Sequence, residues 1–522
     1  MKKLIHVMIG PVLLGYGCAR VQEPPNFLIV FTDDQRVNTL GCYSEDCPIM
    51  TPNLDDLATD GIRFTDGFVT TPICVCSRAC LLTGQYITNN RVHQFITPME
   101  EDVFEHIYPK YLQKAGYFVG QYGKYGVGIT ADQQKQYDAF DADPDQGPAF
   151  RDYNGKMMHD AEWLTVKAGE FLDLVPEGRP FCLQLNYKEP HPSSRPAPED
   201  DNLLNDYNFK RDPMDTDEAA EKVPEFVRMG LGVYKKGEGF GTEEGFNEHL
   251  RQYYEKIVSV DRSVGLIREL LETKGLAGNT VIIFLSDHGT HHGERHFIGK
   301  WRPYEESLRI PFIVYDPRGK AQKGVVRDEM VLNIDIAPTL LDLAGINVPE
   351  LMDGMSMKSL INGSEKNWRS HFFFEHYCSP YMVPSYIPRN VGVRFKDSKY
   401  LKWIEVEADP AKSIEEFYDL DMDPREANNL INNEEYKNEI ENARGIFDTW
   451  RKENPSTFHY DVFGSRAQFG ATEIDWEQFK VEKPADYERI KLEVERLGVS
   501  WEDAIYDWEI RREISANASY WY

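Results

Sequence analysis

The chain has 522 residues, of which 41% are hydrophobic and 12% aromatic, and it carries a formal net charge of −28 at pH 7. This length and composition are sufficient for the cores of one large α/β domain and a smaller one. The negative charge argues against nucleic acid or an anionic membrane surface as a partner, because both would repel the protein. An anionic substrate would therefore need a local cluster of cationic groups.

Residues 1–18 have the pattern of a signal peptide. Two lysines precede an apolar run that is too short to span a bilayer as a stable anchor. The run ends in Gly17-Cys18, as bacterial lipoprotein signals do, although Gly15 replaces the usual leucine. We therefore expect an exported protein of the periplasm or cell surface. Lipidation of Cys18 would anchor it to the membrane, and plain cleavage nearby is the alternative.

The first strand is expected at residues 26–32, a continuous apolar run of the kind that is buried in a parallel sheet. Asp33 and Asp34 follow it, where ligands of such sheets lie. Adjacent carboxylates repel each other unless a positive charge lies between them, so the pair indicates a hard divalent cation. A solvated turn is the alternative. A helix should begin at Thr51, with Pro52 in its first turn.

The stretch Thr71–Gly84 contains three cysteines within seven residues and a single arginine, Arg78. An apolar run follows Arg78, so we expect a loop that leads into a helix. The N-terminus of that helix would offer unpaired N–H donors and the positive end of the helix dipole to an anion. A buried cysteine-rich turn is the alternative. A zinc site would need a second ligand pair at suitable spacing, and none is convincing.

Three later apolar runs also predict buried strands that polar residues follow. Residues 117–122 lead to Lys124, residues 180–187 lead to His191 between two prolines, and residues 280–286 lead to Asp287 and His288. Four of the thirteen histidines fall within nine residues, namely His288, His291, His292 and His296. A zinc cluster is one interpretation, but the carboxylates upstream favour a harder cation.

The pattern predicts four parts in the chain: a signal peptide at 1–18, a catalytic α/β domain at 25–365, a small C-terminal subdomain at 366–453, and an acidic helical extension at 454–522. Within the large domain, an irregular insertion at 196–246 has the composition of loops that shape substrate pockets, and a helix should follow at 248–273. From about residue 371, aromatic-rich strands alternate with turns, which indicates a small antiparallel sheet.

Several motifs in this order resemble those of the type I sulfatases, a formylglycine-dependent family of the alkaline phosphatase-like superfamily. The pattern Cys74-x-x-Ser77-Arg78-x-x-x-Leu82-Thr83-Gly84 is similar to the family signature Cys-x-Pro/Ala-x-Arg, whose cysteine becomes formylglycine (3-oxoalanine). The segments 123–128, 286–289 and 299–300 resemble the family's lysine and metal motifs. Two positions depart from the family pattern: Cys76 replaces proline or alanine, and Gly126 replaces a histidine.

The resemblance implies an α/β sandwich with a mainly parallel central sheet flanked by helices, plus a smaller C-terminal antiparallel sheet. It also implies one divalent cation, calcium, bound by Asp33, Asp34, Asp287 and His288, with residue 74 completing the shell. Formylglycine derived from Cys74 would be the nucleophile and Arg78 would orient it. Lys124, His191 and Lys300 would hold the sulfate, and His191 or Lys300 would protonate the leaving alcohol. A formylglycine-generating maturation enzyme would be a partner.

We therefore predict a sulfatase that acts on a sulfated polysaccharide or oligosaccharide. Because Gly126 stands where the family has the histidine that aids sulfate release, we expect His291 or His292 to substitute. A phosphate or phosphonate monoester hydrolase of the same superfamily is an alternative, and it would more often use Ser or Thr and a second metal site. A catalytically silent glycan-binding homologue is another, and it would keep Cys74 unmodified.

Overall fold

The computed structural model of the protein describes residues 23–93, 98–228, 232–319, 321–365, 367–377, 389–404 and 414–454, and the single residues 491 and 495. The predicted signal peptide with Cys18, and nearly all of the predicted extension at 454–522, lie outside the described residues. No helix in the described ranges is both long enough and apolar enough to cross a membrane.

A nine-stranded central sheet organises the large domain. Its order is β12 (Val325–Arg327), β2 (Ile62–Phe68), β11 (Arg309–Tyr315), β8 (Thr280–Ser286), β1 (Asn26–Asp33), β7 (Phe181–Pro190), β3 (Phe118–Lys124) and β4 (Ala139–Asp143), and β13 (Val331–Leu332) pairs with β2. β11 runs antiparallel to both of its neighbours, whereas the other pairs are parallel. β1 and β8 are wholly buried, which explains their continuous apolar sequences.

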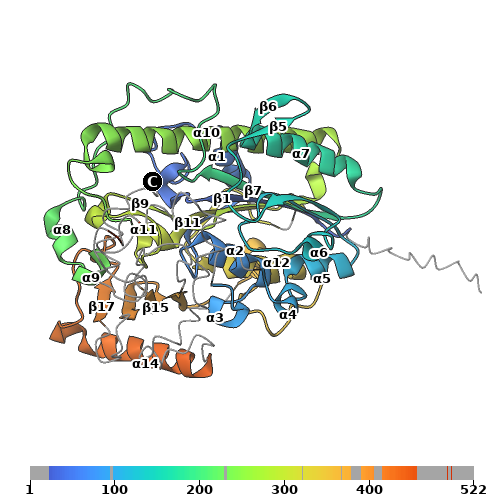
Figure 1. The fold of residues 1–522 in the computed structure, drawn as a ribbon. Helices are drawn as coiled ribbons and strands as arrows, with labels where there is room; N and C mark the ends of the chain where they lie inside the picture. The colour runs from blue at the N-terminus through green and yellow to red at the C-terminus, as the bar shows by residue number, and fades with distance from the viewer. Residues whose placement is uncertain are drawn as a thin grey trace, which may run out of the picture.

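Helices cover both faces of this sheet (Figure 1). One layer contains α1 (Pro52–Asp60), α7 (Asp160–Leu174) and α10 (Glu243–Thr273), and the other contains α2 (Cys74–Thr83), α5 (Tyr108–Lys114) and α12 (Ile336–Leu343). Successive side chains of β1 belong to opposite layers: Leu28 and Val30 join the core on the α10 side, and Phe27, Ile29 and Phe31 join the core on the α2 side. The sheet therefore separates two hydrophobic cores.

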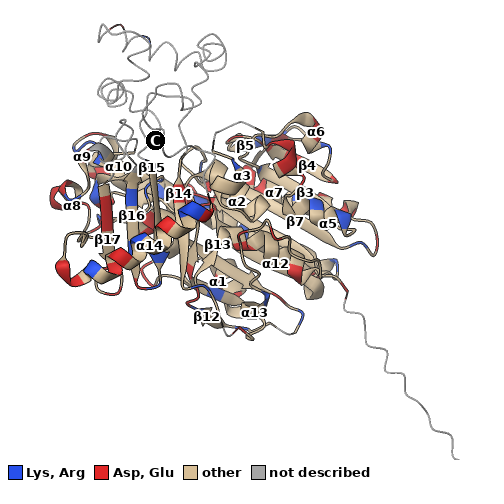
Figure 2. Ribbon diagram, turned by 90° about the horizontal axis from the view of Figure 1, so that it is seen from below, with Lys and Arg blue, Asp and Glu red and all other residues tan. Residues whose placement is uncertain are grey.

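A second, four-stranded antiparallel sheet lies beyond the central one. Its strands are β14 (His371–His376), β15 (Arg389–Phe395), β16 (Ser398–Ile404) and β17 (Ile414–Asp419), in that order. Helix α14 (Lys437–Glu453) packs on β15 and β16, and both acidic and basic residues occur along it in Figure 2. The two sheets fall within the ranges 25–365 and 366–453. The predicted fold class is confirmed.

Two helices begin earlier in the structure than the sequence pattern indicates. α10 begins at Glu243 rather than near Glu248, because the Thr242 side chain accepts the N–H of Gly245 and caps the helix. The predicted insertion also contains two short helices, α8 (Asp217–Glu221) and α9 (Glu225–Arg228). α2 begins at Cys74 itself, so Cys74 lies in the first turn of the helix rather than in the loop before it.

Candidate active site

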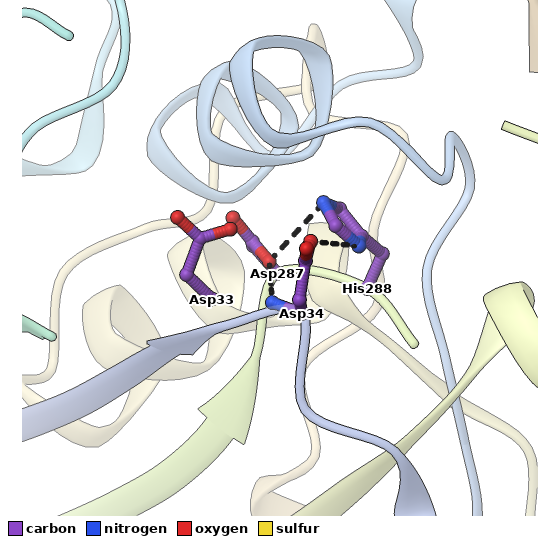
Figure 3. A group of neighbouring side chains, drawn as sticks. All are labelled: Asp33, Asp34, Asp287 and His288. Carbon is purple, nitrogen blue, oxygen red and sulfur yellow. Dashed lines mark hydrogen bonds and ion pairs between the residues drawn. The ribbon is translucent and has the colours of Figure 1, made fainter. Parts of the chain in front are cut away.

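The structure brings the four predicted metal ligands together at the carboxyl ends of two adjacent strands. Asp33 ends β1 and Asp34 follows it, while Asp287 and His288 follow β8. Since Thr32 pairs with Ser286 in the parallel register, the next residues of both strands come to the same edge. One ligand atom from each of the four lies within 4.8 Å of the others, and all four side chains are buried (Figure 3).

The backbone conformation of Asp34 joins the end of β1 to Asp287. Its φ of 64° turns the chain at the end of β1, and its backbone N–H donates to Asp287 Oδ1 at 3.1 Å. The Asp34 carbonyl in turn accepts the hydroxyl of Tyr253, at 2.8 Å, from α10. His288 lies opposite, with Nδ1 at 3.2 Å from Asp34 Oδ1 and Nε2 at 3.4 Å from Asp287 Oδ1.

The group fits a divalent cation. Burial and the neighbouring Asp33 carboxylate raise the pKa of Asp287, as expected when like charges share a buried site. Asp33 Oδ1 and His288 Nε2 are buried and have no hydrogen-bond partner, so both are available as ligand atoms. Carboxylate oxygens are the ligands that calcium prefers, and an imidazole is less usual for so hard an ion. Within the described part of the chain, no second group of this kind is found.

Three buried cationic side chains face these carboxylates. Lys124 Nζ donates to Asp33 Oδ2, and Lys300 Nζ donates to Asp34 Oδ1 at 2.7 Å. The Arg78 guanidinium donates from Nε to Asp287 Oδ2 at 2.9 Å and from Nη1 to the Lys124 carbonyl at 2.6 Å. The surrounding cations hold the pKa of Asp33 well below its ordinary value although burial opposes this. The acidic protein therefore contains the local cationic cluster that an anionic substrate requires.

Cys74 and Arg78 reach the site from α2. Cys74 is the first residue of this helix and is 3% exposed, and Arg78 lies one turn later over the Phe31 ring, with its guanidinium carbon 4.7 Å from the ring centroid. Gly84 ends the helix with φ 70°, and its N–H donates to the Cys80 carbonyl. Cys76, the rival sulfur of the motif, is fully buried in the core between α2 and the sheet.

β7 carries His191 to the same edge of the sheet. The His191 Nδ1 accepts the backbone N–H of Ser193 at 3.1 Å, and the His191 Nε2 lies 3.4 Å from Gln146 Nε2. This Nε2 lies 3.9 Å from Asp34 Oδ2. Burial and the nearby Lys300 lower the pKa of His191 well below its ordinary value, while Asp34 opposes this shift. The uncharged imidazole therefore faces the carboxylates.

His291 and His292, the predicted substitutes for the missing histidine, pack against aromatic rings. The His291 ring centroid lies 5.6 Å from that of Phe297, and the His292 centroid lies 4.5 Å from that of Tyr253. Both side chains are buried, and burial lowers the pKa of His291 to about 3. Neither joins the candidate metal ligands, and neither does His296. Their part in catalysis stays a prediction, and the described residues do not form the alternative zinc cluster.

The environment of Gly126 explains why this position has no side chain. Gly126 has φ 71°, and a Cβ built on it would lie 2.5 Å from Arg78 Cδ and 3.0 Å from Arg78 Nε. The Arg78 side chain therefore occupies the space that a side chain at position 126 would need. A histidine at this position would require Arg78 to move.

Comparison with known proteins gives the relatives of this chain. A protein-family model described as Sulfatase matches residues 25–346, and another, described as N-sulphoglucosamine sulphohydrolase, C-terminal, matches residues 293–451. The N-acetylglucosamine-6-O-sulfatase of Bacteroides thetaiotaomicron is 27% identical over 500 residues, covering 80% of this chain and 86% of the relative. An arylsulfatase of Clostridium perfringens is 28% identical over 476 residues, covering 81% of this chain and 93% of the relative.

A solved structure shares the fold of this chain. It is a complex of a protein with its substrate D-glucosamine-2-N,6-O-disulfate, and it matches with a TM-score of 0.72 at 24% identity. The match covers 84% of this chain and 100% of that one.

Proposed function

This chain belongs to the sulfatase family and is a sulfuric ester hydrolase, and from this premise we propose that it removes sulfate from a sulfated polysaccharide or oligosaccharide. One observation carries the proposal. The carboxylates of Asp33, Asp34 and Asp287 and the imidazole of His288 form one buried cluster beside the N-terminus of α2. The cationic side chains of Lys124, Lys300 and Arg78 contact this cluster. The names of the relatives, which include a hexosamine sulfatase, support a carbohydrate substrate.

The family uses a divalent cation and a formylglycine, and the site has residues for both. We propose that Asp33, Asp34, Asp287 and His288 hold calcium, and that Cys74 is converted to formylglycine. A bound divalent cation screens the charge of sulfuryl oxygens and lowers the pKa of a neighbouring hydroxyl. Formylglycine supplies such a hydroxyl, as its hydrate, for attack on sulfur. At the start of α2, residue 74 lies at the positive end of the helix dipole, which favours a developing anion there.

The other residues of the site hold and orient the ester. Lys124, Lys300 and the Nε2 atom of His191 converge on one edge of the sheet, and these three groups suit the oxygens of a sulfate ester. Fixed donors of this kind stabilise the charge that is redistributed in the transition state. Either His191 or Lys300 donates the proton to the leaving alcohol. Arg78, fixed by Asp287 and the Lys124 carbonyl, holds α2 and so residue 74 in place.

The first experiment is peptide mass measurement across residues 63–91, after expression of the protein with a formylglycine-generating maturation enzyme. We expect position 74 to lose its sulfur and position 76 to keep it. Cys76→Ala should retain both conversion and activity, whereas Cys74→Ala should lose both. An unmodified Cys74 in an otherwise active enzyme would contradict the formylglycine assignment.

The second experiment is substrate turnover. We expect sulfate release from members of a panel of sulfated oligosaccharides, and much slower turnover of the matching phosphate esters. Faster phosphate release would favour the phosphate or phosphonate hydrolase, and glycan binding without turnover would favour the silent homologue. We further propose that His291 or His292 assists release of sulfate after the first turnover. Unchanged turnover in both His291→Ala and His292→Ala would reject that role.

We also propose that the protein is exported to the periplasm or cell surface through residues 1–18. Lipidation of Cys18 would place the enzyme at a membrane. Fractionation of cells that express the chain and its Cys18→Ala variant tests this, because the anchored protein should partition with membranes and the variant should not. Recovery of both proteins in the soluble exported fraction would favour plain cleavage.

A further inference from the structure

Lys256 is a buried lysine that the proposed chemistry does not use. It lies in the middle of α10 and is 3% exposed. Its Nζ donates to two backbone carbonyls, those of Pro190 at 3.2 Å and His191 at 3.0 Å. Both carbonyls belong to the turn that carries the His191 imidazole. A side chain from α10 thus holds a turn 65 residues away in the sequence.

Packing alone does not account for a lysine at this position. A buried ammonium group costs free energy unless it is paired or hydrogen-bonded, and a methionine would fill a similar volume without that cost. Burial lowers the pKa of Lys256 to about 8, although the charges of Glu189 and Asp34 oppose this shift. The hydrogen bonds to the two carbonyls therefore have to offset much of the free-energy cost of removing the Lys256 ammonium group from water. A residue that is unfavourable for stability at a buried position beside an active site points to a role in function.

The backbone bonds of this turn are local, whereas Gln146 contacts the turn from outside: its Nε2 lies 3.4 Å from His191 Nε2, and its Oε1 accepts the Ser193 hydroxyl at 3.2 Å. The His191 N–H donates to the Lys188 carbonyl, and the Ser194 N–H donates to the His191 carbonyl, each at 2.9 Å. Pro190 pairs with Asp33 in the central sheet, and Gln146 belongs to the loop between β4 and β5 (Phe150–Tyr153). Lys256 connects the turn to a 31-residue helix that packs on the sheet through its buried side. Loss of this tie would let the segment after Pro190 shift, and the Nε2 of His191 would shift with it.

We propose that Lys256 is a positioning residue, which fixes the turn of Pro190 and His191 so that the His191 Nε2 faces the leaving-group oxygen of the bound ester. The inference rests on the proposed role of His191 in protonating the leaving alcohol. Lys256 acts through His191 and not by touching the substrate. The hydrogen bonds of its Nζ, more than its charge, are the feature that matters.

Two substitutions separate the hydrogen bonds from the charge. Lys256→Met removes both, whereas Lys256→Gln removes the charge and keeps an N–H donor. Arg268→Met is the control, because Arg268 is a cation on the same helix that pairs with Asp60, away from the turn. Each variant of the full chain, with residue 74 converted, is measured on a sulfated sugar that the parent enzyme hydrolyses and on an aryl sulfate, whose leaving group needs little protonation.

We expect Lys256→Met to lower kcat on the sugar sulfate by roughly 10²-fold, the cost of a misplaced catalytic group, and to affect the aryl sulfate far less. Lys256→Gln should keep more of the activity, and Arg268→Met should behave as the parent. Adding His191→Ala to Lys256→Met should cause little loss beyond His191→Ala alone, because both changes remove one function.

The inference is overturned if Lys256→Met lowers turnover of both esters equally, or if its effect multiplies with that of His191→Ala. Equal losses in Lys256→Gln and Lys256→Met would assign the effect to charge and would also overturn it. If Lys256→Met does not fold, Lys256→Gln takes its place. Its turnover of the two esters is then compared with that of the parent enzyme, and the double variant with His191→Ala is compared with each single variant. A parent enzyme that releases no sulfate from any sugar would instead reject the proposed function, a different outcome from an active parent with an unaffected Lys256→Met.

Discussion

Restoring the family's histidine by Gly126→His should damage this enzyme. A residue other than glycine at a φ near 70° costs roughly 1–2 kcal/mol. The new Cβ would lie 2.5 Å from Arg78 Cδ, whereas carbon atoms prefer about 3.5–4.0 Å, so the arginine must retreat by about 1 Å. Such a shift strains the bonds from Arg78 to Asp287 and to the Lys124 carbonyl.

A second glycine with a similar φ separates the steric cost against Arg78 from the backbone cost. Gly155 has φ 81°, and a Cβ built there would meet nothing within 4 Å, so Gly155→Ala reports the backbone cost alone. Losing one charge-assisted hydrogen bond of Arg78 costs about 1.5–3 kcal/mol, which is the expected gap between Gly126→Ala and Gly155→Ala. Turnover by Gly126→Ala and Gly126→His should fall by roughly 10²-fold, because Arg78 no longer fixes residue 74.

Chemical denaturation gives the free energy of unfolding for each variant, and sulfate release gives its turnover. A Gly126→His variant that is as stable as Gly155→Ala, and turns over as fast as the parent enzyme or faster, would contradict this expectation. That result would mean that the site accommodates the histidine and that Arg78 has another place to go.

Three further outcomes follow from the site and its surroundings. Lys300→Met should lower kcat/KM by roughly 10²–10³-fold, as loss of a fixed donor to developing charge does. The control Lys114→Met, on the exposed side of α5, should leave kcat/KM unchanged, and equal effects of the two changes would argue against the placement of the sulfate. A chelator should lower the melting temperature and abolish sulfate release, added calcium should restore both, and Asp287→Asn should remove the response; an identical melting temperature with and without chelator would count against the ion. The buried Glu294 pairs with Arg36 at 2.7 Å, and this pairing lowers the pKa of Glu294 from 4.5 to about 2, against the effect of burial. The pair therefore contributes up to about 3 kcal/mol of stability above pH 4.5, which is lost as the pH falls towards 2. Glu294→Gln should flatten the unfolding free energy across that pH window, and an unchanged slope would refute the assignment.

The sequence was informative where function depends on strand ends. Wholly buried strands have continuous apolar sequences, and the carboxyl ends of parallel strands lie at the same edge of the sheet. The apolar runs place Asp33 and Asp34, and likewise Asp287 and His288, at the ends of strands, and the resemblance to the sulfatases groups the four as one metal site. Their roles remain predictions, but their proximity in the structure follows from the pairing of β1 with β8.

Contacts between distant elements could not be predicted in this way. Lys256 lies in a long helical pattern, and only its place among the buried residues of α10 distinguishes it from a surface lysine. The bonds to Pro190 and His191 depend on how α10 crosses the sheet, which local spacing does not encode. The same limit applies to Gly126, whose lack of a side chain is explained by Arg78, a residue of the distant helix α2.

The histidines at 291 and 292 illustrate a different difficulty. They form the short strand β9 (His291–His292), which pairs with β10 (Ile298–Gly299), and neighbouring side chains in a strand point to opposite sides. His291 consequently meets Phe297 and Tyr304, whereas His292 meets Tyr253. Counting histidines along the sequence cannot reveal this divergence.

The partition of the large domain into two cores has a consequence for how such enzymes diverge. Cys74 and Arg78 belong to the layer of α2, whereas the turn of His191 is held from α10 across the sheet. Because the two cores lie on opposite faces of the sheet, residues on the α10 side can change without repacking the core around α2. Selection for a new substrate can therefore act on one face of the sheet while Cys74 and Arg78 are inherited unaltered on the other.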